Sequence, residues 1–453
     1  MKDGARNLSS GTRLIVGFGS TGASVARYLE REGLAYAVTD SRAHPPGADA
    51  SMQAPHVFGR FESPLPADQI AEAVVSPGVS LGESLLEDLR ALGVPVVGDI
   101  ELFARALDRI PDSGSRVPSV IAITGTNGKS TVCSLVTAMA RAAGRVAVAG
   151  ANLGTPALDL IDPRVELYVL ELSSFQLELT HSLAPLVATV LNVSDDHLDR
   201  HGSIEAYVNA KARIYARSRI AVFNREDARV MAMQFGDATC IGFGLDAPPS
   251  ECDYGLREGM LCRGDQVLFA AADVPLAGRH NLANVLAAWA IAAAAGVDDA
   301  SIARAVRAFR PLAHRLTAVG EHAGVRYFDD SKATNVSAAT ATLAGLAGPL
   351  VVIAGGQGKG QDFTAFAGML AERARAVVLL GVDAPLIELA IAGRIPVVKA
   401  ANMEGAVSAA ARLAQSGDSV VLAPACASFD MFDNYGARGD AFARAVEALF
   451  DGC

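Results

Sequence analysis

The segment AITGTNGKST, residues 122–131, contains the residue types that bind the phosphates of a nucleotide. Glycines let backbone N–H groups face phosphate oxygens, the following helix N-terminus adds partial positive charge, and Lys129 can reach the terminal phosphates. A hydroxyl beside that lysine, here Ser130 or Thr131, commonly ligates Mg²⁺. Ile123 replaces the first glycine of the strict GxxxxGK[ST] pattern, but an apolar run precedes the loop and a helical pattern follows it. We therefore predict a phosphate-binding loop rather than an ordinary glycine-rich turn. Its other residues are Gly125, Thr126, Asn127 and Gly128.

Acidic side chains and imidazoles follow two further apolar runs. Glu171 ends the run ELYVLE, at the position where open α/β sheets place their ligands, and a carboxylate there suits Mg²⁺ beside a phosphate loop. The segment LNVSDDHLDRHG, residues 191–202, indicates a second metal site, a proton-transfer site or a solvated acidic loop. Its chemical groups are Asp195, Asp196, His197, Asp199 and His201.

Cations and hydroxyls also follow strand-like runs in the last third of the chain. Arg315, Lys332 and Lys359 lie in HRL, DDSKATN and GGQGKGQDF, where they could bind phosphate or a substrate carboxylate, or could be surface charges. The segment APACASFDMFDNYGARG adds Ser428 and Tyr435. In the predicted helix AYVNAKARIYAR, Lys211 lies among apolar residues, where a lysine is usually snorkelling or paired.

The N-terminal segment LIVGFGSTGASVARYLEREGLAYAVTD has the dinucleotide-binding fingerprint. Its key positions are Gly17, Gly19, Gly22 and Asp40. An NAD dehydrogenase would explain these residues but would leave the phosphate loop and Glu171 without a role. A P-loop regulatory or motor NTPase would explain Lys129 but not the first and last thirds of the chain.

The elements that must position these residues alternate between strand-like and helical runs, as in doubly wound α/β sheets. We predict three domains, 1–108, 109–311 and 312–453, with a linker in the Pro-, Ser- and Gly-rich segment 106–119. The first and third are expected to be Rossmann-like, and the central one to be P-loop ATPase-like. Short strand-like pieces in 219–277 suggest a small added sheet in the central domain.

Composition limits the class of protein. With 453 residues, 51% of them hydrophobic, the chain can bury several cores, and a net charge of −10 argues against a broad nucleic-acid surface. Its six cysteines form no CxxC pair, which favours reduced thiols in a cytoplasm. The longest apolar run, residues 285–297, is shorter than the roughly 20 residues that span a bilayer, and the first ten residues lack a signal-peptide pattern. We expect a cytoplasmic protein without membrane or nucleic-acid partners.

Together the motifs resemble the Mur ligase family, whose ATP-dependent amino-acid ligases build the peptidoglycan peptide. The segments GTNGKST, ELSSFQLE, NVSDDHLDRHG, GRHNLAN, HRL, DDSKATN and PACASFD occur in the order of that family and cover essentially the whole chain. DDSKATN and APACASFD are most similar to the member that adds D-glutamate. The resemblance implies that D-glutamate is joined to UDP-N-acetylmuramoyl-L-alanine through an acyl phosphate. An alternative is another ligase of this superfamily with a different amino acid, or a folylpolyglutamate synthase-like enzyme.

The resemblance implies roles for residues of the central and last domains. Lys129 would contact the transferred γ-phosphate, and Glu171 with Ser130 and Thr131 would hold one Mg²⁺. His197 matches a ligand of a second Mg²⁺, and Lys211 matches the lysine that family members carbamylate. Further ATP contacts, beyond the loop of residues 125–131, are implied for Asn281, Arg315, Asp330 and Lys332. Since Arg315 and Asp330 come from the last domain, we expect that domain to close over ATP.

The resemblance also implies the sites of the other two substrates. The first domain would bind the uridine diphosphate group, so Asp40 need not contact an NAD ribose. The implied contacts are Ser20, Thr21, Ser41, Arg42 and Gly78 for the uridine nucleotide, and Asn152 for the muramoyl group. Those for D-glutamate are Thr334, Lys359, Ser428 and Tyr435. Tyr435 and Gln357 depart from the phenylalanine and the acid that the family usually has there. The expected partners are small molecules only, and the expected state is a monomer.

Overall fold

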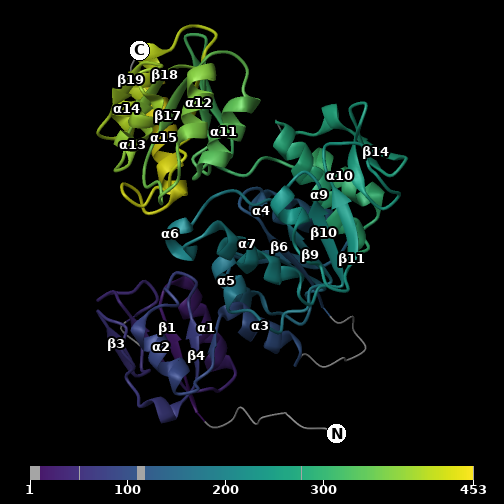
Figure 1. Ribbon diagram of the computed structural model, residues 1–453, viewed down its shortest axis with the longest axis vertical. Coiled ribbons are helices and arrows are strands. Elements are labelled where there is room, and N and C mark those ends of the chain that lie inside the picture. The colour runs from purple at the N-terminus through teal and green to yellow at the C-terminus, as the bar shows by residue number, and fades with distance from the viewer. Residues whose placement is uncertain (1–10, 50–51, 110–117, 277, 452–453) are drawn as a thin grey trace.

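The computed structural model describes residues 11–49, 52–109, 118–276 and 278–451. They form three sheets with their helices, arranged along the long axis of the molecule from the N-terminal sheet to the C-terminal sheet (Figure 1). The predicted α/β class with three sheet-based units is therefore confirmed. Most of the predicted linker, residues 110–117, lies outside the described residues, as do the first ten residues and Cys453.

The N-terminal sheet has five parallel strands in the order β3-β2-β1-β4-β5. The strands are β1 (Thr12–Val16), β2 (Tyr36–Asp40), β3 (His56–Phe58), β4 (Ile70–Val75) and β5 (Val96–Val97). The helices are α1 (Ser20–Arg31), α2 (Ser84–Ala91) and α3 (Asp99–Leu107). Consecutive residues Leu14, Ile15 and Val16 are fully buried, because helices cover both faces of a parallel sheet.

The central sheet has nine strands in the order β14-β13-β12-β11-β10-β9-β6-β8-β7. The strands are β6 (Ser119–Thr124), β7 (Ala147–Ala151), β8 (Leu167–Glu171), β9 (Val187–Val190), β10 (Ile220–Asn224), β11 (Thr239–Phe243), β12 (Tyr254–Arg257), β13 (Met260–Arg263) and β14 (Gln266–Ala270). The helices are α4 (Lys129–Ala142), α5 (Ser174–Glu178), α6 (Leu198–His201), α7 (Ile204–Ala212), α8 (Ala228–Met231), α9 (Arg279–Ala294) and α10 (Asp299–Ala308). The apolar run of residues 285–292 lies in α9 and is fully buried. None of the helices in the described part of the chain is long and apolar enough to span a membrane.

Residues 219–277 contain the expected short strands, but these strands do not form a sheet of their own. β10 and β11 pair in parallel with the central sheet, and β12, β13 and β14 form an antiparallel meander at its edge. The meander joins β11 through one residue pair, Phe243 and Tyr254. This pair continues the sheet from β11 into the meander. The predicted small added sheet is therefore corrected to an extension of the central sheet.

The N-terminal and central sheets share one apolar core. Alternate residues of the central strands point to opposite faces, so that Ala122 and Leu170 belong to the shared core whereas Ile123 packs against α4 and α9 on the other face. Helix α3 connects the two sheets, since Phe103 packs edge-to-face on Tyr168 at a centroid distance of 5.3 Å. The two units are thus joined by packing as well as by the chain.

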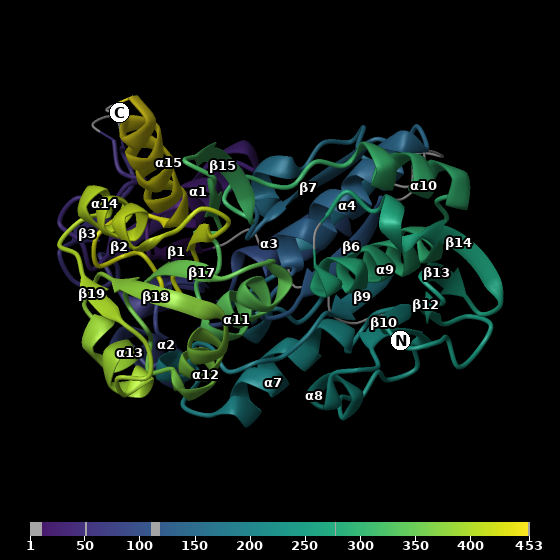
Figure 2. The same ribbon diagram turned by 90° about the horizontal axis from the view of Figure 1, so that it is seen from above.

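The C-terminal sheet has six strands in the order β15-β16-β20-β17-β18-β19, parallel except for the β15–β16 hairpin. The strands are β15 (Thr317–His322), β16 (Val325–Asp329), β17 (Leu350–Ala354), β18 (Ala374–Leu379), β19 (Val397–Lys399) and β20 (Ser419–Leu422). The helices are α11 (Val336–Gly345), α12 (Thr364–Arg373), α13 (Ala384–Ile391), α14 (Met403–Leu413) and α15 (Tyr435–Asp451). Helix α11 lies on the side of this unit that faces the central sheet, as two views show (Figures 1 and 2).

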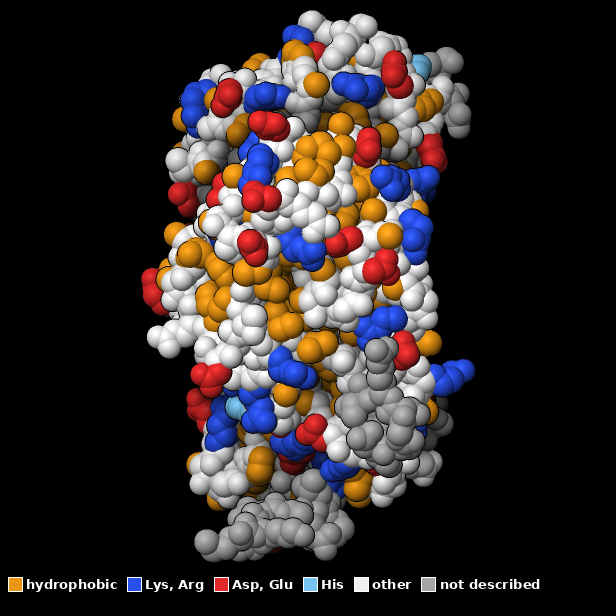
Figure 3. All heavy atoms as spheres, turned by 90° about the vertical axis from the view of Figure 1, so that its right-hand side faces the viewer, with side chains coloured by type: hydrophobic (Ala, Val, Ile, Leu, Met, Phe, Trp, Pro, Cys, Tyr) orange, Lys and Arg blue, Asp and Glu red, His pale blue; other side chains and the backbone are white. Residues whose placement is uncertain are grey.

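The surface carries both charge signs. On the face shown in Figure 3, lysines and arginines alternate with acidic residues and do not form a continuous basic area.

Candidate active site

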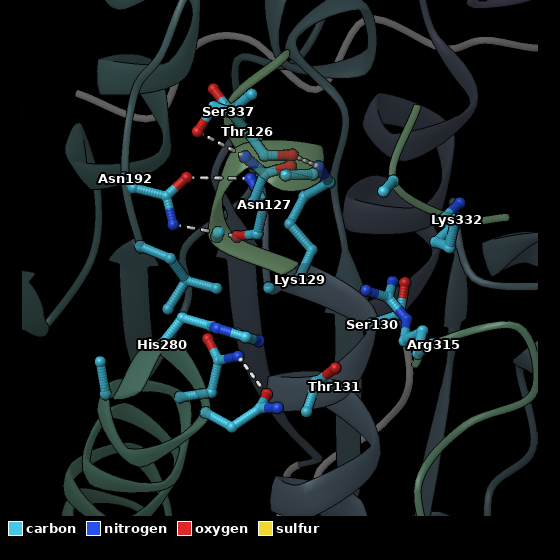
Figure 4. Close-up of a pocket in the computed structure, with 18 of the residues that line it drawn as sticks. Thr126, Asn127, Lys129, Ser130, Thr131, Asn192, His280, Arg315, Lys332 and Ser337 are labelled. Carbon is cyan, nitrogen blue, oxygen red and sulfur yellow. Dashed lines mark hydrogen bonds between the residues drawn. The ribbon is translucent and has the colours of Figure 1, made fainter. Parts of the chain in front are cut away.

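The phosphate loop connects β6 to α4, as predicted. Gly128 has a left-handed φ of +85°, and a Cβ atom there would lie 2.4 Å from Asn284 Oδ1, so this position requires glycine. The loop is held from the side by Asn192, whose Oδ1 accepts from the Asn127 N–H at 2.9 Å and whose Nδ2 donates to the Asn127 carbonyl at 3.1 Å (Figure 4). These bonds engage the Asn127 N–H and fix the conformation of the loop, which leads into the N-terminus of α4.

Lys129 folds back across this loop. Its Nζ donates to the carbonyls of Gly125 at 2.7 Å and Thr126 at 2.8 Å. Burial lowers the pKa of the Lys129 ammonium, and the nearby Glu171 and Asp196 carboxylates act in the opposite direction. A cation is therefore held in place against the loop at the start of α4.

Glu171 ends β8 beside the start of α4 and is 3% exposed. Its Oε1 accepts from Asn152 Nδ2 at 2.6 Å, whereas its Oε2 is buried without a hydrogen-bond partner among the described residues. Burial alone would raise the pKa of the Glu171 carboxyl, but Lys129 and hydrogen bonds from Ser130 and Asn152 hold it below its ordinary value. An ionised carboxylate with one unused buried oxygen beside a hydroxyl is a suitable Mg²⁺ ligand.

His197 follows β9 in the segment that leads into α6. It has a left-handed φ of +54°, and its ring packs edge-on against Phe175 at 5.1 Å. Burial lowers the pKa of His197 to about 4, with Asp196 opposing the shift and neighbouring lysines adding to it. The imidazole is therefore neutral at neutral pH, as a metal ligand must be.

Lys211 lies on α7 and is 1% exposed. Its Nζ donates to the Gly125 carbonyl at 3.0 Å and lies 4.4 Å from the centre of the Tyr207 ring. Burial, together with Lys129, lowers the pKa of the Lys211 amine well below its ordinary value. The residues alone gave no functional signal for Lys211, because an interior lysine in a helix has no distinctive pattern; only the resemblance indicated it.

The C-terminal sheet contributes cations and an acid to the same site. Arg315, Asp330 and Lys332 line a cavity of 570 Å³ together with the phosphate loop, Glu171, Asn152, Asn281 and His197. Burial raises the pKa of the Asp330 carboxyl to about 6. Burial and the nearby Arg315 charge lower the pKa of the Lys332 ammonium to about 8. Figure 4 shows Arg315 and Lys332 on the same side of the site as Ser130. The structure thus brings together predicted residues that are far apart in the sequence, such as Lys129 and Lys332.

Of the four residues assigned to D-glutamate, two line the cavity and two do not. Thr334 and Lys359 line the cavity, and Lys359 Nζ lies 3.5 Å from Asp196 Oδ1. Ser428 and Tyr435 do not line it, although Tyr435 begins α15 and its ring lies 3.8 Å from Lys332 Nζ. Ser428 is buried beside the bridge between Gln357 and Ala427. Thr334, Lys359 and Ser428 lie in segments that follow β16, β17 and β20, and Tyr435 is the first residue of α15.

The residues assigned to the uridine nucleotide lie in the N-terminal unit, away from this cavity. They follow β1, β2 and β4 at one edge of the sheet, where ligands of open α/β sheets bind. Asp40, the acid of the fingerprint, accepts from the Phe18 N–H at 2.6 Å and from the Arg42 guanidinium at 2.7 and 2.9 Å. Its oxygens are thus engaged within the chain, which explains why the fingerprint does not require an NAD ribose.

A hydrogen bond links this edge to the cavity. Arg200 Nη2, in α6, donates to the Val79 carbonyl at 2.6 Å, directly after Gly78. The segment that carries His197 therefore contacts the loop that carries Gly78. The described residues hold no group of three or more His, Cys, Asp and Glu that could bind a metal by itself. Mg²⁺ sites beside phosphates commonly use only one or two carboxylates.

Comparisons with known proteins agree with this arrangement. Three family models match in order: "Mur ligase MurD-like, N-terminal domain" at residues 11–98, "Mur ligase middle domain" at 123–292 and "Mur ligase, glutamate ligase domain" at 314–426. The UDP-N-acetylmuramoylalanine--D-glutamate ligase of Nitrosococcus oceani is 48% identical over 97% of both chains. The chain belongs to the Mur ligase family. The ligase of the same name from Legionella pneumophila is 45% identical over 96% of this chain and 99% of its own.

Solved structures show the same fold at low sequence identity. The UDP-N-acetylmuramate-alanine ligase of Thermotoga maritima has a TM-score of 0.61 at 18% identity and covers 98% of this Mur ligase and 100% of its own chain. A pseudomurein peptide ligase type C from Methanothermus fervidus has a TM-score of 0.63 at 16% identity, covering 97% and 100%. The predicted three-unit fold and the prediction of an ATP-dependent, Mg²⁺-using ligase are confirmed. The dehydrogenase and NTPase alternatives do not fit this family.

Proposed function

We propose that this Mur ligase joins D-glutamate to UDP-N-acetylmuramoyl-L-alanine and converts ATP to ADP and phosphate, in cytoplasmic synthesis of peptidoglycan precursor. The observation that carries the proposal is the 570 Å³ cavity, where the phosphate loop, the buried carboxylate of Glu171 and cations of the C-terminal sheet meet. The relatives of highest identity named above bear the name of this activity. We further propose that the enzyme acts as a monomer on small molecules alone, with domains at 1–108, 109–311 and 312–453.

In the first step the carboxylate of the precursor attacks the γ-phosphate of ATP, because a carboxylate is a poor electrophile until it is activated. The products are an acyl phosphate and ADP. Lys129 and the N–H groups of the phosphate loop would neutralise charge on the phosphoryl oxygens, joined by Arg315 and Lys332. Asp330 and Asn281 would orient the nucleotide. Asn152, which contacts Glu171, would contact the muramoyl group.

In the second step the amine of D-glutamate attacks the acyl carbonyl, and the tetrahedral intermediate expels phosphate. Lys359 and Thr334 would hold the amino acid from inside the cavity, with Ser428 and Tyr435 behind them. The amine must lose a proton before it attacks. An imidazole whose pKa is about 4 is a weak base, so we assign His197 to metal binding rather than to this proton transfer.

The residues of the site fit Mg²⁺. Glu171 has an unused buried oxygen, and Ser130 and Thr131 lie beside it at the start of α4, so these three would hold one ion. A second would be held by His197 and a carbamylated Lys211, since burial lowers the pKa of the Lys211 amine and so favours the neutral form that reacts with CO₂. When bound, the ions supply positive charge that stabilises the phosphoryl oxygens.

The uridine diphosphate group would bind at the edge of the N-terminal sheet. Ser20 and Thr21 open α1, whose N-terminus favours an anion. Ser41, Arg42 and Gly78 would complete the site. Arg42 forms an ion pair with Asp40, and its side chain is half-exposed at this edge of the sheet.

The test of the function is phosphate release from ATP with UDP-N-acetylmuramoyl-L-alanine, with D-glutamate, L-glutamate, L-alanine and meso-diaminopimelate offered in turn. Release with D-glutamate alone is the expected result. Release with another amino acid would keep the ligase chemistry and overturn the substrate assignment. Release from ATP without any amino acid would contradict the ligase function itself.

The carbamate of Lys211 has its own test. Protein equilibrated with ¹³C-bicarbonate should show a carbamate carbon resonance that is absent in Lys211→Arg, because the guanidinium does not react with CO₂. Lys399→Arg, at an exposed lysine on β19, is the control and should keep the resonance. A resonance that survives in Lys211→Arg, or that never forms in the wild type, would contradict this proposal.

A further inference from the structure

Arg438 is a buried cation that none of the sequence motifs singled out. It lies in the first turns of α15 and is 2% exposed. Burial lowers the pKa of its guanidinium to about 10, with Cys426, Asp430 and Asp329 opposing the shift, so the group remains charged at neutral pH. Burying a charge is costly unless hydrogen bonds compensate for the lost water. The contacts of Arg438 therefore indicate what the burial achieves.

The guanidinium donates three hydrogen bonds to two different loops. Nε donates to Ser331 Oγ at 3.0 Å and Nη2 to the Ser331 carbonyl at 2.8 Å, whereas Nη1 donates to the Cys426 carbonyl at 3.0 Å. Ser331 Oγ in turn donates to the Tyr435 carbonyl at 2.8 Å. A Cβ atom on Gly356 would lie 3.3 Å from Nη1, so a third loop passes directly over the group.

Each segment around Arg438 carries a residue assigned to the amino acid. Ser331 directly precedes Lys332 and the Thr334 turn, and Cys426 is two residues before Ser428. Gly356 is three residues before Lys359, and Tyr435 starts the helix that carries Arg438 itself. These segments follow different strands, β16, β17 and β20, so the sheet alone does not fix their loops relative to one another.

We propose that Arg438 is the positioning residue of the amino-acid pocket. Its planar guanidinium bonds the loops that carry Thr334 and Ser428, reaches the start of α15 at Tyr435 through Ser331, and lies against the loop that carries Lys359. Arg438 itself does not contact the substrate. A fork of fixed geometry suits this purpose because its donors cannot rotate independently. The inference rests on the proposed function only in placing the amino acid among these loops.

The variants are Arg438→Met, Arg438→Lys and Ser331→Ala, with Arg444→Met as control. Arg444 lies on the same helix but is exposed, so Arg444→Met makes the same change in α15 without removing a contact to the loops. Arg438→Met should raise KM for the amino acid by about tenfold or more, the effect of roughly one buried charge-assisted hydrogen bond. KM for ATP should rise by a smaller factor, because only Asp330 and Lys332, which flank Ser331, connect the proposed ATP contacts to Arg438, whereas the phosphate loop belongs to the central sheet. Arg444→Met should behave like the wild type.

The conservative variants separate positioning from simple stability. Arg438→Lys keeps the charge but cannot bridge Ser331 and Cys426 with a rigid fork, so its KM should lie between those of wild type and Arg438→Met. Ser331→Ala removes the link to Tyr435 and should raise KM for the amino acid by a smaller factor. The preference for the D over the L amino acid should fall in the same order. A merely structural role would lower the melting temperature and the active fraction but leave KM and this preference unchanged.

The outcomes distinguish this inference from the proposed function. The wild-type substrate profile decides the function; if the wild type uses a different amino acid, the same KM comparison is made with that one. Variants of Arg438 that lose stability or kcat alone, with KM for the accepted amino acid unchanged, overturn the inference whatever the substrate. If the wild type accepts no amino acid, the function fails, and the inference fails with it.

Discussion

At the scale of single residues, the cavity contains acidic and basic side chains whose burial favours their neutral forms. Burial raises the pKa of Asp330 to about 6 and lowers that of Lys332 to about 8. Both shifts mean that the folded state binds protons differently from the unfolded chain, so stability depends on pH. A site arranged before its substrates arrive is therefore maintained at some expense of stability, as in many enzymes.

Asp330→Asn should stabilise the fold. The folded state binds more protons than the unfolded state between pH 4 and 6, so wild-type stability falls as pH rises through that range and the full penalty is present above it. A shift of this size corresponds to about 2–3 kcal/mol, and Asn can keep the contacts with Thr342 and the Leu316 N–H. Thermal unfolding should show a higher melting temperature for Asp330→Asn than for the wild type at pH 7.5. The difference between the two melting temperatures should become smaller towards pH 5. Phosphate release should fall, because Asp330 is proposed to orient ATP.

Asp418→Asn is the control of opposite sign on the same sheet. Hydrogen bonds from Arg375, the shorter at 2.6 Å, lower the pKa of Asp418 below its ordinary value. Removing that charge should lower the melting temperature at pH 7.5. A destabilised Asp330→Asn, or a difference in melting temperature from the wild type that does not change with pH, would contradict the assignment of a costly charge at Asp330.

At the scale of elements, local patterns predicted the strand, loop and helix that contain the proposed phosphate-binding residues. The phosphate loop between β6 and α4 could be found because its glycines, lysine and flanking apolar runs are consecutive in the sequence. The edge meander β12–β14 could be located but not attached to its sheet, because the order of strands depends on contacts between distant segments. For the same reason the sequence did not reveal that Lys211 reaches the Gly125 carbonyl. No local rule distinguishes that lysine from one that packs in a core.

Two short helices show a further contact that only tertiary structure produces. Ser174 is the first residue of α5, and its Oγ forms a hydrogen bond of 2.9 Å with Nε2 of His201 in α6. His201 Nδ1 lies 3.4 Å from Glu178 Oε1, and the Phe175 ring packs against His201 and also against His197. Since α5 follows Glu171 and α6 follows His197, this tether fixes the distance between the two proposed metal-binding segments.

Ser174→Ala should therefore weaken metal binding. We expect the Mg²⁺ concentration for half-maximal phosphate release to rise about tenfold, the usual effect of losing a group that orients metal ligands. Binding of Mn²⁺ in the presence of ADP, followed by electron paramagnetic resonance, gives a readout that does not depend on turnover. Ser250→Ala, at an exposed turn where the hydroxyl bonds Asp253 at 2.7 Å, is the matched control. Equal metal affinities for Ser174→Ala and the control would show that the tether has no such effect.

At the scale of the whole molecule, the C-terminal unit contacts the central one through a few polar side chains. Asn335 Nδ2 donates to Asn127 Oδ1 at 3.0 Å and to Asp196 Oδ2 at 3.3 Å, and Lys359 forms an ion pair with the same carboxylate. Asn127 Nδ2 also donates to Ser337 Oγ at 3.2 Å. These contacts join α11 directly to the phosphate loop, so binding of ATP and closure of the C-terminal unit should be coupled.

Asn335→Asp tests that coupling with little change to local structure. Asn335 caps α11 by accepting from the Ala338 N–H at 2.8 Å, and aspartate caps helices equally well. The new carboxylate loses the Nδ2 donor and faces Asp196, so repulsion should open the cavity, increase the radius of gyration in X-ray scattering and raise KM for ATP. Asn402→Asp makes the same change at the cap of α14, where the side-chain oxygen accepts from the Gly405 N–H at 2.9 Å. If Asn335→Asp scatters like Asn402→Asp and keeps its KM for ATP, closure does not depend on this contact. If only Asn335→Asp opens, a single amide between two units sets how well the phosphate loop and the C-terminal cations meet.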